Sequence, residues 1–470
     1  MLNSKTRPIR LSLSPALCRE NIISTKAYAG KWGVRYDTRC AVQVRREMQR
    51  HPGAQTMKDK SNDRAKKNAS RADSQGRRRF LQATTAMAAS VAGGLTDLWG
   101  DEGREPGSPM RPYGDRSPFE KAARRSSRPG PLAGTGSTLT PLESLYGIIT
   151  PSALHFERHH SGVPMIDPDK HELLIHGLVE KPIVFKMEEI KRFPSVSRIH
   201  FLECSGSSAG EYQGDPAPTP QQTAGLFSCS EWTGVPLSTL LREAGLKPAA
   251  KWVLAEGGDA SRNARSIPLE KAMDDVLVAY GQNGEAVRPE QGYPIRLLVP
   301  GWEGNINVKW LQRLHVLDQP AMTRDEAADY DDLLANGKSY RFSFVMEAKS
   351  IVTRPAGGQH LDGPGAYVIT GLAWSGRARV SGVEISTDGG KNWRKAEIQQ
   401  PVLKNAAVRF RLPWDWDGNE AVIGSRCTDE SGYVQPTHEQ IVAARGTHAR
   451  FHYNGIKWWR LQKTGELTYA

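Results

Sequence analysis

The chain has 470 residues, of which 38% are hydrophobic and 24% are charged, so it is too long for one hydrophobic core and too apolar for a disordered chain. Its net charge is +12, but residues 1–95 hold 20 of the 63 Lys and Arg residues and only 6 of the 51 Asp and Glu residues. The rest of the chain therefore carries a net charge of −2 and shows no basic surplus of the kind that nucleic-acid binding requires.

Residues 1–95 are predicted to form an N-terminal extension that ends in an export signal. Residues 76–82 read Gly-Arg-Arg-Arg-Phe-Leu-Gln, which resembles the twin-arginine export signature, and the uncharged small-residue stretch 83–95 follows. This stretch is shorter than the ~20 residues that cross a bilayer, so no membrane span is predicted. The alternative is a basic helix start followed by an Ala-rich helix. Because twin-arginine export carries folded proteins, often with a cofactor inserted, we expect a periplasmic protein with a cofactor.

Beyond the extension, the composition changes twice. Residues 96–140 are rich in Gly, Pro, Arg and Ser, which predicts a flexible arm or linker. Residues 141–335 combine short strand-like apolar runs with helical spacing, which predicts a mixed α+β domain. Residues 338–470 show repeated strand patterns bounded by turn residues, which predicts an immunoglobulin-like β-sandwich.

Individual elements can be placed within these two domains. Helical spacing occurs at 237–244 and 269–279. Strands are predicted at 173–178 and 252–256 in the first domain, and at 341–351, 366–374, 380–386, 392–398, 407–412 and 420–427 in the second.

Three cysteines lie outside the extension: Cys204, Cys229 and Cys427. An odd number in an oxidising compartment means that at least one is free, bound to a metal or paired with another chain. Whether Cys229 and Cys427 pair stays open. No Cys-x-x-Cys-His occurs in the sequence, so no covalent haem is expected on this chain.

Four separated segments carry a family resemblance. They read Phe-Glu-Arg-His-His-Ser-Gly-Val-Pro at 156–164, Phe-Leu-Glu-Cys-Ser-Gly at 201–206, Glu-Trp-Thr-Gly-Val-Pro-Leu at 231–237, and Tyr-Pro-Ile-Arg-Leu-Leu-Val-Pro-Gly at 293–301 followed by Val-Lys-Trp-Leu. In this order they resemble the molybdopterin-binding domain of the sulfite-oxidase family. The strand-rich tail resembles the immunoglobulin-like dimerisation domain of the same family. The resemblance implies one molybdenum–molybdopterin cofactor per chain and a homodimer formed through the C-terminal domain.

The resemblance also implies roles for eight residues. Cys204 matches the metal ligand, a soft thiolate donor, and Arg158 matches an arginine that binds anions in two-point contact. The other matches are Tyr280 beside the metal, Arg445 reaching into the substrate pocket, His160 and Asp259 bonded to the pterin, and Arg296 and Lys309 as the basic pair on its phosphate. Each has a structural alternative, such as core packing for Tyr280 or a surface ion pair for Arg158.

The chain departs from vertebrate-type sulfite oxidases close to the metal ligand. Those enzymes have Gly-Asn-Arg-Arg after the cysteine, where this chain has Gly-Ser-Ser-Ala at 206–209. A tryptophan of those enzymes is replaced by Gln222-Thr223, and His159 stands where Asn is usual. Without this arginine and this tryptophan, we expect the pocket to bind a small dianion more weakly and to be more open.

These departures favour one branch of the family. The segments 109–114, 147–152, 155–160, 346–350 and 426–436 resemble the molybdenum subunit of the sulfane dehydrogenases of sulfur-oxidising (Sox) systems. The resemblance implies oxidation of sulfane sulfur on the cysteine of a carrier protein, with electrons passed to a cytochrome c subunit in a heterotetramer. Two alternatives stay open: a sulfite dehydrogenase, and a non-catalytic subunit that uses the β-sandwich for interaction.

Overall fold

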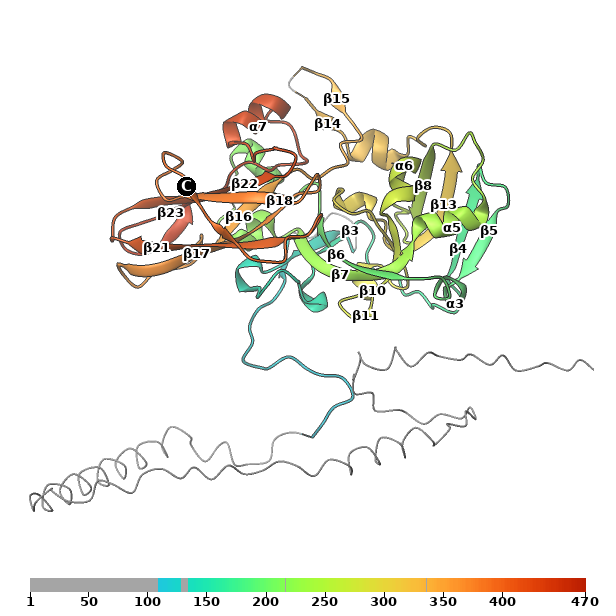
Figure 1. The fold of residues 1–470 in the computed structure, drawn as a ribbon, viewed down its shortest axis with the longest axis horizontal. Coiled ribbons are helices and arrows are strands. Elements are labelled where there is room, and N and C mark those ends of the chain that lie inside the picture. The colour runs from blue at the N-terminus through green and yellow to red at the C-terminus, as the bar shows by residue number, and fades with distance from the viewer. Residues whose placement is uncertain (1–108, 128–133, 216, 335) are drawn as a thin grey trace, which may run out of the picture. The chain divides into compact units, whose positions relative to one another are not determined.

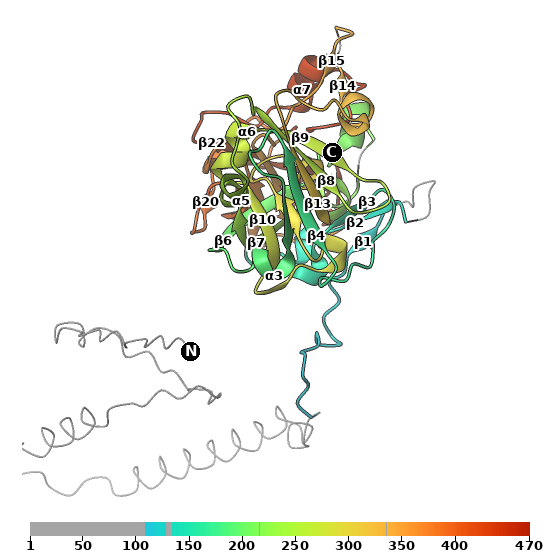
Figure 2. The ribbon, with the colours of Figure 1, turned by 90° about the vertical axis from the view of Figure 1, so that its right-hand side faces the viewer.

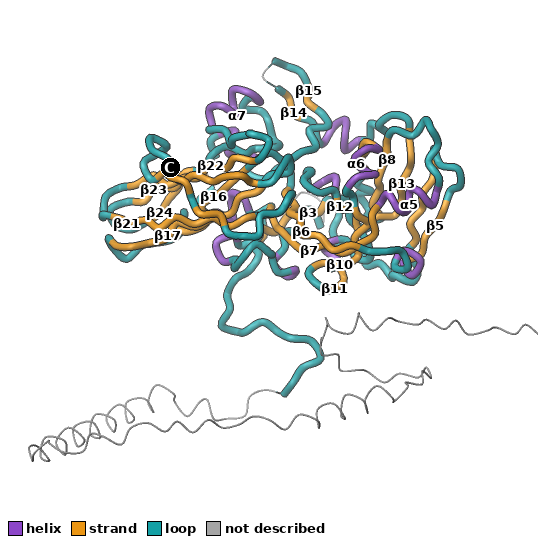
Figure 3. The backbone as a smooth tube through the Cα atoms, viewed as in Figure 1, coloured by secondary structure: helices purple, strands orange, loops and turns teal. Residues whose placement is uncertain are grey.

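The computed structural model describes residues 109–127, 134–215, 217–334 and 336–470. Residues Tyr113–Ala470 form one compact unit, and of the chain before it only residues 109–112 are described. The expected export signal lies outside the described residues. Within Tyr113–Ala470, strands predominate and the helices are short (Figures 1 and 3). No helix among the described residues has the length and apolarity that crossing a membrane requires.

Three sheets build the first half of this unit (Figure 2). Their orders are β1-β2-β3, β11-β10-β7-β6 with β12 also paired to β10, and β5-β4-β13-β8-β9, in which β13 runs parallel to β4 and antiparallel to β8. The bounds are β1 Arg125–Ser126, β2 Gly136–Leu139, β3 Glu157–His159, β4 Glu172–Gly177, β5 Ile183–Lys186, β6 Val196–Glu203, β7 Phe227–Pro236, β8 Trp252–Gly257, β9 Ala264–Pro268, β10 Leu277–Gln282, β11 Glu285–Ala286, β12 Arg296–Leu298 and β13 Leu311–Leu317. Four short helices accompany them: α3 Met187–Ile190, α4 Pro220–Ala224, α5 Leu237–Ala244 and α6 Leu269–Asp274.

Helix α5 shows how the local sequence builds this half. Leu237, Leu240, Leu241 and Ala244 are fully buried at helical spacing, and they join a core with residues of β4, β8, β10 and β13. Gly245 ends the helix with a φ of 71°, a conformation that glycine adopts without strain. The helix predicted at 237–244 is confirmed.

The second half is a two-layer β-sandwich preceded by a small hairpin of β14 Asp332–Leu333 and β15 Ser339–Tyr340. The two sheets have the orders β16-β17-β21-β20 and β19-β18-β22-β23-β24. The bounds are β16 Lys349–Arg354, β17 Gly365–Trp374, β18 Val380–Ser386, β19 Arg394–Lys395, β20 Glu397–Ile398, β21 Val408–Trp416, β22 Ala421–Asp429, α7 His438–Arg445, β23 Trp458–Leu461 and β24 Leu467–Tyr469.

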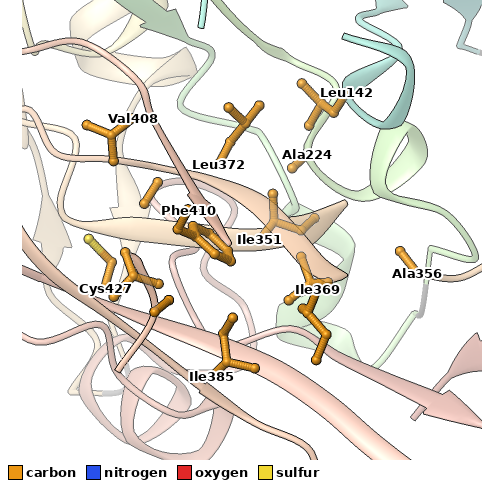
Figure 4. Close-up of a cluster of buried hydrophobic side chains, with 14 of the residues drawn as sticks. Leu142, Ala224, Ile351, Ala356, Ile369, Leu372, Ile385, Val408, Phe410 and Cys427 are labelled. Carbon is orange, nitrogen blue, oxygen red and sulfur yellow. The ribbon is translucent and has the colours of Figure 1, made fainter. Parts of the chain in front are cut away.

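The sandwich core continues into the first half. Figure 4 shows Ile351, Ile369 and Phe410 of the sandwich in one buried cluster with Leu142 and Ala224 of the first half. The same cluster includes Phe201 of β6 together with Phe227 and Cys229 of β7, and the ring of Phe227 stacks on that of Trp374 at 3.9 Å between centroids. The end of β6 that leads into Cys204 is therefore packed directly against the C-terminal sandwich.

The α+β fold with an immunoglobulin-like sandwich is confirmed, with four local differences. The strand predicted at 392–398 is two short strands, β19 and β20, which belong to different sheets. The helix predicted at 269–279 ends at Asp274, because Leu277–Gln282 pairs with β7 and β12. The strand predicted at 341–351 begins only at Lys349, because Phe342 and Phe344 have φ of 55° and 52°, which a strand cannot contain. The end of the predicted arm forms β1 and β2. Cys229 and Cys427 are both free and buried, and burial raises the pKa of the Cys229 thiol to about 12.

Candidate active site

A cavity lies where loops at the strand ends of the first half meet. The lining comes from β3 and the loop after it, the turn after β6, the loop after β8, the segments before β12 and β13, and Tyr330. Six of the eight residues expected at the site line it: Arg158, His160, Cys204, Asp259, Arg296 and Lys309. Tyr280 and Arg445 do not line it. The six residues come from five chain segments. The fold therefore brings together residues that are up to about 150 positions apart in the sequence.

Cys204 follows directly after the last residue of β6. A Cβ placed on Gly206 would lie 3.9 Å from the Cys204 Sγ, so the turn passes close beside the sulfur. Burial raises the pKa of the Cys204 thiol, while the Gly206 backbone N–H and the Arg158 charge act in the opposite direction. Within the protein alone the thiol therefore keeps its proton, and a bound metal cation would displace it.

Arg296 is buried and Lys309 is partly buried, and neither has a carboxylate within ion-pair distance in the described part of the chain. Arg296 donates to the Gln291 and Asn307 carbonyl oxygens at 2.9 and 3.0 Å, but its Nε has no partner in the part of the chain that the structure describes. Burial lowers the pKa of Arg296 to about 9, and burial together with the Arg296 charge lowers that of Lys309. Two cations that line one cavity and have no ion-pair partner among the described residues favour an anionic ligand there.

Asp259 and His160 also line the cavity. The Asp259 Oδ2 accepts hydrogen bonds from the hydroxyls of Ser161, at 3.0 Å, and Ser261. Burial lowers the pKa of His160 to about 4, so its imidazole is neutral at neutral pH and offers both a donor and an acceptor. The buried Asn263 Oδ1 has no hydrogen-bond partner among the described residues.

This donor set fits a molybdopterin cofactor. The thiol of Cys204 suits the metal, Arg296 and Lys309 suit a phosphate, and the partnerless Arg296 Nε and Asn263 Oδ1 suit the edge of a polar ring system. The cavity is narrow, with a volume of ≈80 Å³. The long side chains of Arg158 and Lys309, which line it, would have to turn for a pterin to enter.

Tyr280 lies elsewhere than expected. It lines a separate surface groove with Met187, Lys191 and Thr233, and its ring packs against the core that contains α5. The tyrosine of the Cys204 cavity is Tyr330, whose Oη lies 3.0 Å from His160 Nε2 and whose ring carries the Arg265 guanidinium at 4.9 Å. Burial and the nearby Cys204 thiol raise the pKa of Tyr330, so its phenol stays protonated and can donate a proton or a hydrogen bond.

We expect Tyr330→Phe to lower kcat by about 100-fold, the effect of removing a positioned proton donor. Molybdenum content should stay unchanged, because the phenol is not a metal ligand. Steady-state turnover and metal analysis of the same preparation measure both quantities. Tyr280→Phe, in the separate groove, is the matched control and should leave kcat unchanged. If Tyr280→Phe lowered kcat and Tyr330→Phe did not, Tyr280 would be the proton donor.

Arg445, at the end of α7, is held outside the cavity by carboxylates. Its Nη1 lies 3.5 Å from Asp332 Oδ2, and its Nη2 lies 3.8 Å from Glu347 Oε1. The guanidinium also lies 5.6 Å from the centroid of the Tyr340 ring. The substrate-pocket role expected for Arg445 has no support in this geometry, because these partners engage the side chain away from Cys204.

His452 joins the two halves of the unit next to the site. Its backbone N–H donates to the Ser205 carbonyl oxygen at 2.8 Å, and its buried ring lies 3.6 Å from Glu303 Oε2 and 3.5 Å from Glu347 Oε2. Burial lowers the pKa of His452, but the nearby carboxylates of Glu303 and Glu347 outweigh burial and raise it to about 9. The imidazolium is therefore the charged form at neutral pH.

This raised pKa predicts a loss of stability at alkaline pH. The imidazolium stabilises the fold fully below the ordinary His pKa of ~6.5, and that contribution disappears as the pH rises toward about 9. The free energy of unfolding of the wild type should exceed that of His452→Gln at low pH. We expect this difference to decrease by on the order of 3 kcal/mol between pH ~6.5 and about 9. Urea unfolding at several pH values measures it. His360→Gln, at a histidine whose side chain is 58% exposed, should show no such slope.

A wider groove lies beside the Cys204 turn. It has a volume of ≈620 Å³ and runs between the β1–β2 hairpin and the segment that follows Cys204. Its lining includes Gly206, Ser208, Ala209, Gln222 and Thr223. These are the positions at which the sequence lacks the arginine and the tryptophan of vertebrate-type sulfite oxidases, so open space lies next to the turn where those enzymes carry the two bulky side chains.

Comparison with known proteins agrees with this geometry. Residues 160–324 match the family model of the oxidoreductase molybdopterin binding domain, and residues 341–458 match that of the Mo-co oxidoreductase dimerisation domain. The chain belongs to the sulfite-oxidase family, and it is a molybdopterin-binding, molybdenum-dependent oxidoreductase.

Within that family, one solved structure is similar over most of the chain. The crystal structure of the sulfane dehydrogenase SoxCD from Paracoccus pantotrophus matches with 44% identity and a TM-score of 0.77, covering 79% of this chain and 97% of that chain. The NADH nitrate reductases of Ulva prolifera and Arabidopsis thaliana are 32% and 33% identical over 333 and 336 residues. Those matches cover 62% of this chain but only 38% and 36% of the two enzymes.

Proposed function

We propose that this protein oxidises sulfane sulfur bound to the cysteine of a carrier protein and passes the electrons to a cytochrome c partner. The observation that carries the proposal is the groove beside Cys204, where Ser208, Ala209 and Gln222 line open space. A sulfur atom on a protein arm needs room for the arm, whereas a small dianion is bound best by a closed pocket with several cations. The similarity to a sulfane dehydrogenase supports the same substrate class.

The residues of the cavity divide the chemistry among them. The bound cofactor would supply two-electron redox chemistry at the metal held by Cys204. Arg158 lines the cavity beside Cys204 and binds the oxyanion that develops on sulfur as oxygen from water is added. Each two-electron step takes one oxygen atom from water and releases two protons, and the hydrogen-bonded pair Tyr330 and His160 holds or moves a proton at the phenol oxygen and Nε2.

The test compares two substrates with one electron acceptor. We expect reduction of cytochrome c to be fast with a sulfane-loaded carrier and slow with free sulfite. Fast turnover of sulfite, with none of the loaded carrier, would establish a sulfite dehydrogenase instead. Absence of molybdenum from the purified protein would favour a non-catalytic subunit.

The place of action and the assembly are part of the proposal. The basic extension with Arg77-Arg78 supports periplasmic location by twin-arginine export. Fractionation of cells that express the chain with both arginines replaced by lysine tests it, and unchanged export would contradict it. The match to a dimerisation domain supports a homodimer, to which cytochrome subunits would add to give a heterotetramer. Light scattering with and without the cytochrome measures both states.

A further inference from the structure

We propose that Lys349, a residue of the C-terminal sandwich, positions the Cys204 turn and thereby controls how firmly the metal is held. Lys349 is the first residue of β16, and only 4% of it is exposed. It is not among the residues that line the Cys204 cavity, so its influence is exerted through the turn.

The ammonium group of Lys349 contacts the chain on both sides of Cys204. Its Nζ donates to Glu203 Oε1 at 2.9 Å, one residue before the cysteine, and to Ser208 Oγ at 3.0 Å, four residues after it. The other carboxylate oxygen of Glu203 accepts from Trp374 Nε1 at 2.6 Å. Trp374 is the cross-strand partner of Lys349, so two adjacent side chains of the sandwich fix one carboxylate.

Ser208 needs such a contact because of its backbone. Its φ is 63°, the left-handed region that costs a residue with a side chain about 1 kcal/mol or more. The Ser208 hydroxyl donates to the Thr223 carbonyl oxygen at 2.8 Å while it accepts from Lys349. The contact from Lys349 therefore helps to hold the turn in a conformation that the backbone alone disfavours.

The opposite side of the turn is fixed by the first half of the unit. A Cβ on Gly304 would lie 2.9 Å from the Glu203 carbonyl oxygen and 3.2 Å from the Cys204 Cα, so only glycine allows this approach. Asn305 Nδ2 donates to Ser205 Oγ at 3.1 Å. The Cys204 turn is thus held between the segment 303–305 and Lys349, and the C-terminal sandwich completes the support of the metal ligand.

Charge adds to this mechanical role. Glu203 is fully buried directly before Cys204, and a buried carboxylate needs a partner of opposite charge. Lys349 compensates that carboxylate inside the protein. Some residues hold a metal ligand in place without binding the metal themselves. Removing such a residue lowers metal affinity or activity by about 10- to 100-fold.

The experiment uses three variants of the full-length holoprotein. Lys349→Met removes the ammonium group and leaves Glu203 uncompensated. The double variant Glu203→Gln/Lys349→Met leaves no unpaired charge, so it should fold even if the single variant does not. It also lacks the contact from Lys349 to Ser208, so it still tests the proposal. Lys457→Met breaks a second buried ion pair, Lys457 with Glu211 at 2.6 Å, whose partners do not adjoin Cys204.

We expect Lys349→Met and the double variant to retain about tenfold less molybdenum after dialysis, or to shift the Mo(V) EPR spectrum at equal metal content. Lys457→Met should lower the melting temperature while molybdenum content and spectrum stay as in the wild type. Wild-type metal content and spectrum in the double variant would overturn the proposal, since Lys349 would then only neutralise Glu203. Equal metal loss in Lys457→Met would also overturn it. These measurements need no substrate, so they stand whether sulfane sulfur or sulfite is oxidised.

Discussion

Cys204→Ser is expected to abolish turnover and to remove the metal's protein ligand. A hydroxyl is a harder and weaker donor than a thiolate. The other two cysteines of the described residues, Cys229 and Cys427, lie in the core shared with the sandwich and do not line the Cys204 cavity. Removal of a residue that only supports a metal ligand lowers activity by about 10- to 100-fold, and we expect a larger loss for the ligand itself. Turnover with the loaded carrier and molybdenum per chain are the two measurements.

The control for this prediction is Cys229→Ala. Cys229 is as completely buried as any core residue, and it lies on β7 opposite Phe201 of β6. Its removal leaves a small cavity that costs roughly 1 kcal/mol or more of stability, but it does not touch the metal site. We expect full molybdenum content and normal turnover below the melting temperature. Turnover of Cys204→Ser at the level of Cys229→Ala would remove Cys204 from the mechanism.

The sequence predicted those parts of the fold that depend on local patterning. The strand at 380–386 and the helix at 237–244 coincide with β18 and α5, because each has its apolar residues at the spacing of one buried face. The failures occur where tertiary pairing decides. Leu277–Gln282 continues a helical spacing, yet it forms the strand β10 because β7 and β12 lie on either side of it.

The site divides in the same way. Cys204 and Arg158 stand within distinctive short segments, so a resemblance could place them. Tyr330 follows the π-helical segment Asp325–Asp329, whose acidic and alanine residues carry no motif. It lines the cavity in contact with His160, which is far away in the chain. The sequence around Lys349 gives even less indication of a role at the site. A lysine at a strand end ordinarily faces solvent, and the burial of Lys349 depends on its contact with Glu203.

Ala209→Arg is expected to move the enzyme's preference from the tethered substrate toward free sulfite. Ala209 lines the groove beside Cys204 at a position where vertebrate-type sulfite oxidases carry an arginine. A guanidinium there would bind a dianion through charge-assisted hydrogen bonds and would also occupy space that the carrier's arm needs. We expect KM for sulfite to fall by about tenfold, since such bonds contribute about 1.5–3 kcal/mol. Turnover of the loaded carrier should fall by at least a similar factor.

Ala209→Leu separates charge from bulk in this prediction. Leucine narrows the groove but offers no donor, so it should slow the loaded carrier and leave KM for sulfite unchanged. A second narrowing variant, Gln222→Trp, alters the groove wall at a partly exposed residue of α4 and should behave like Ala209→Leu. If all three variants oxidise the loaded carrier at the wild-type rate, the groove is not the path of the arm. If only Ala209→Arg slows the carrier, the added charge rather than the lost space controls access. Steady-state kinetics with both substrates therefore decide whether the open groove selects sulfur carried on a protein.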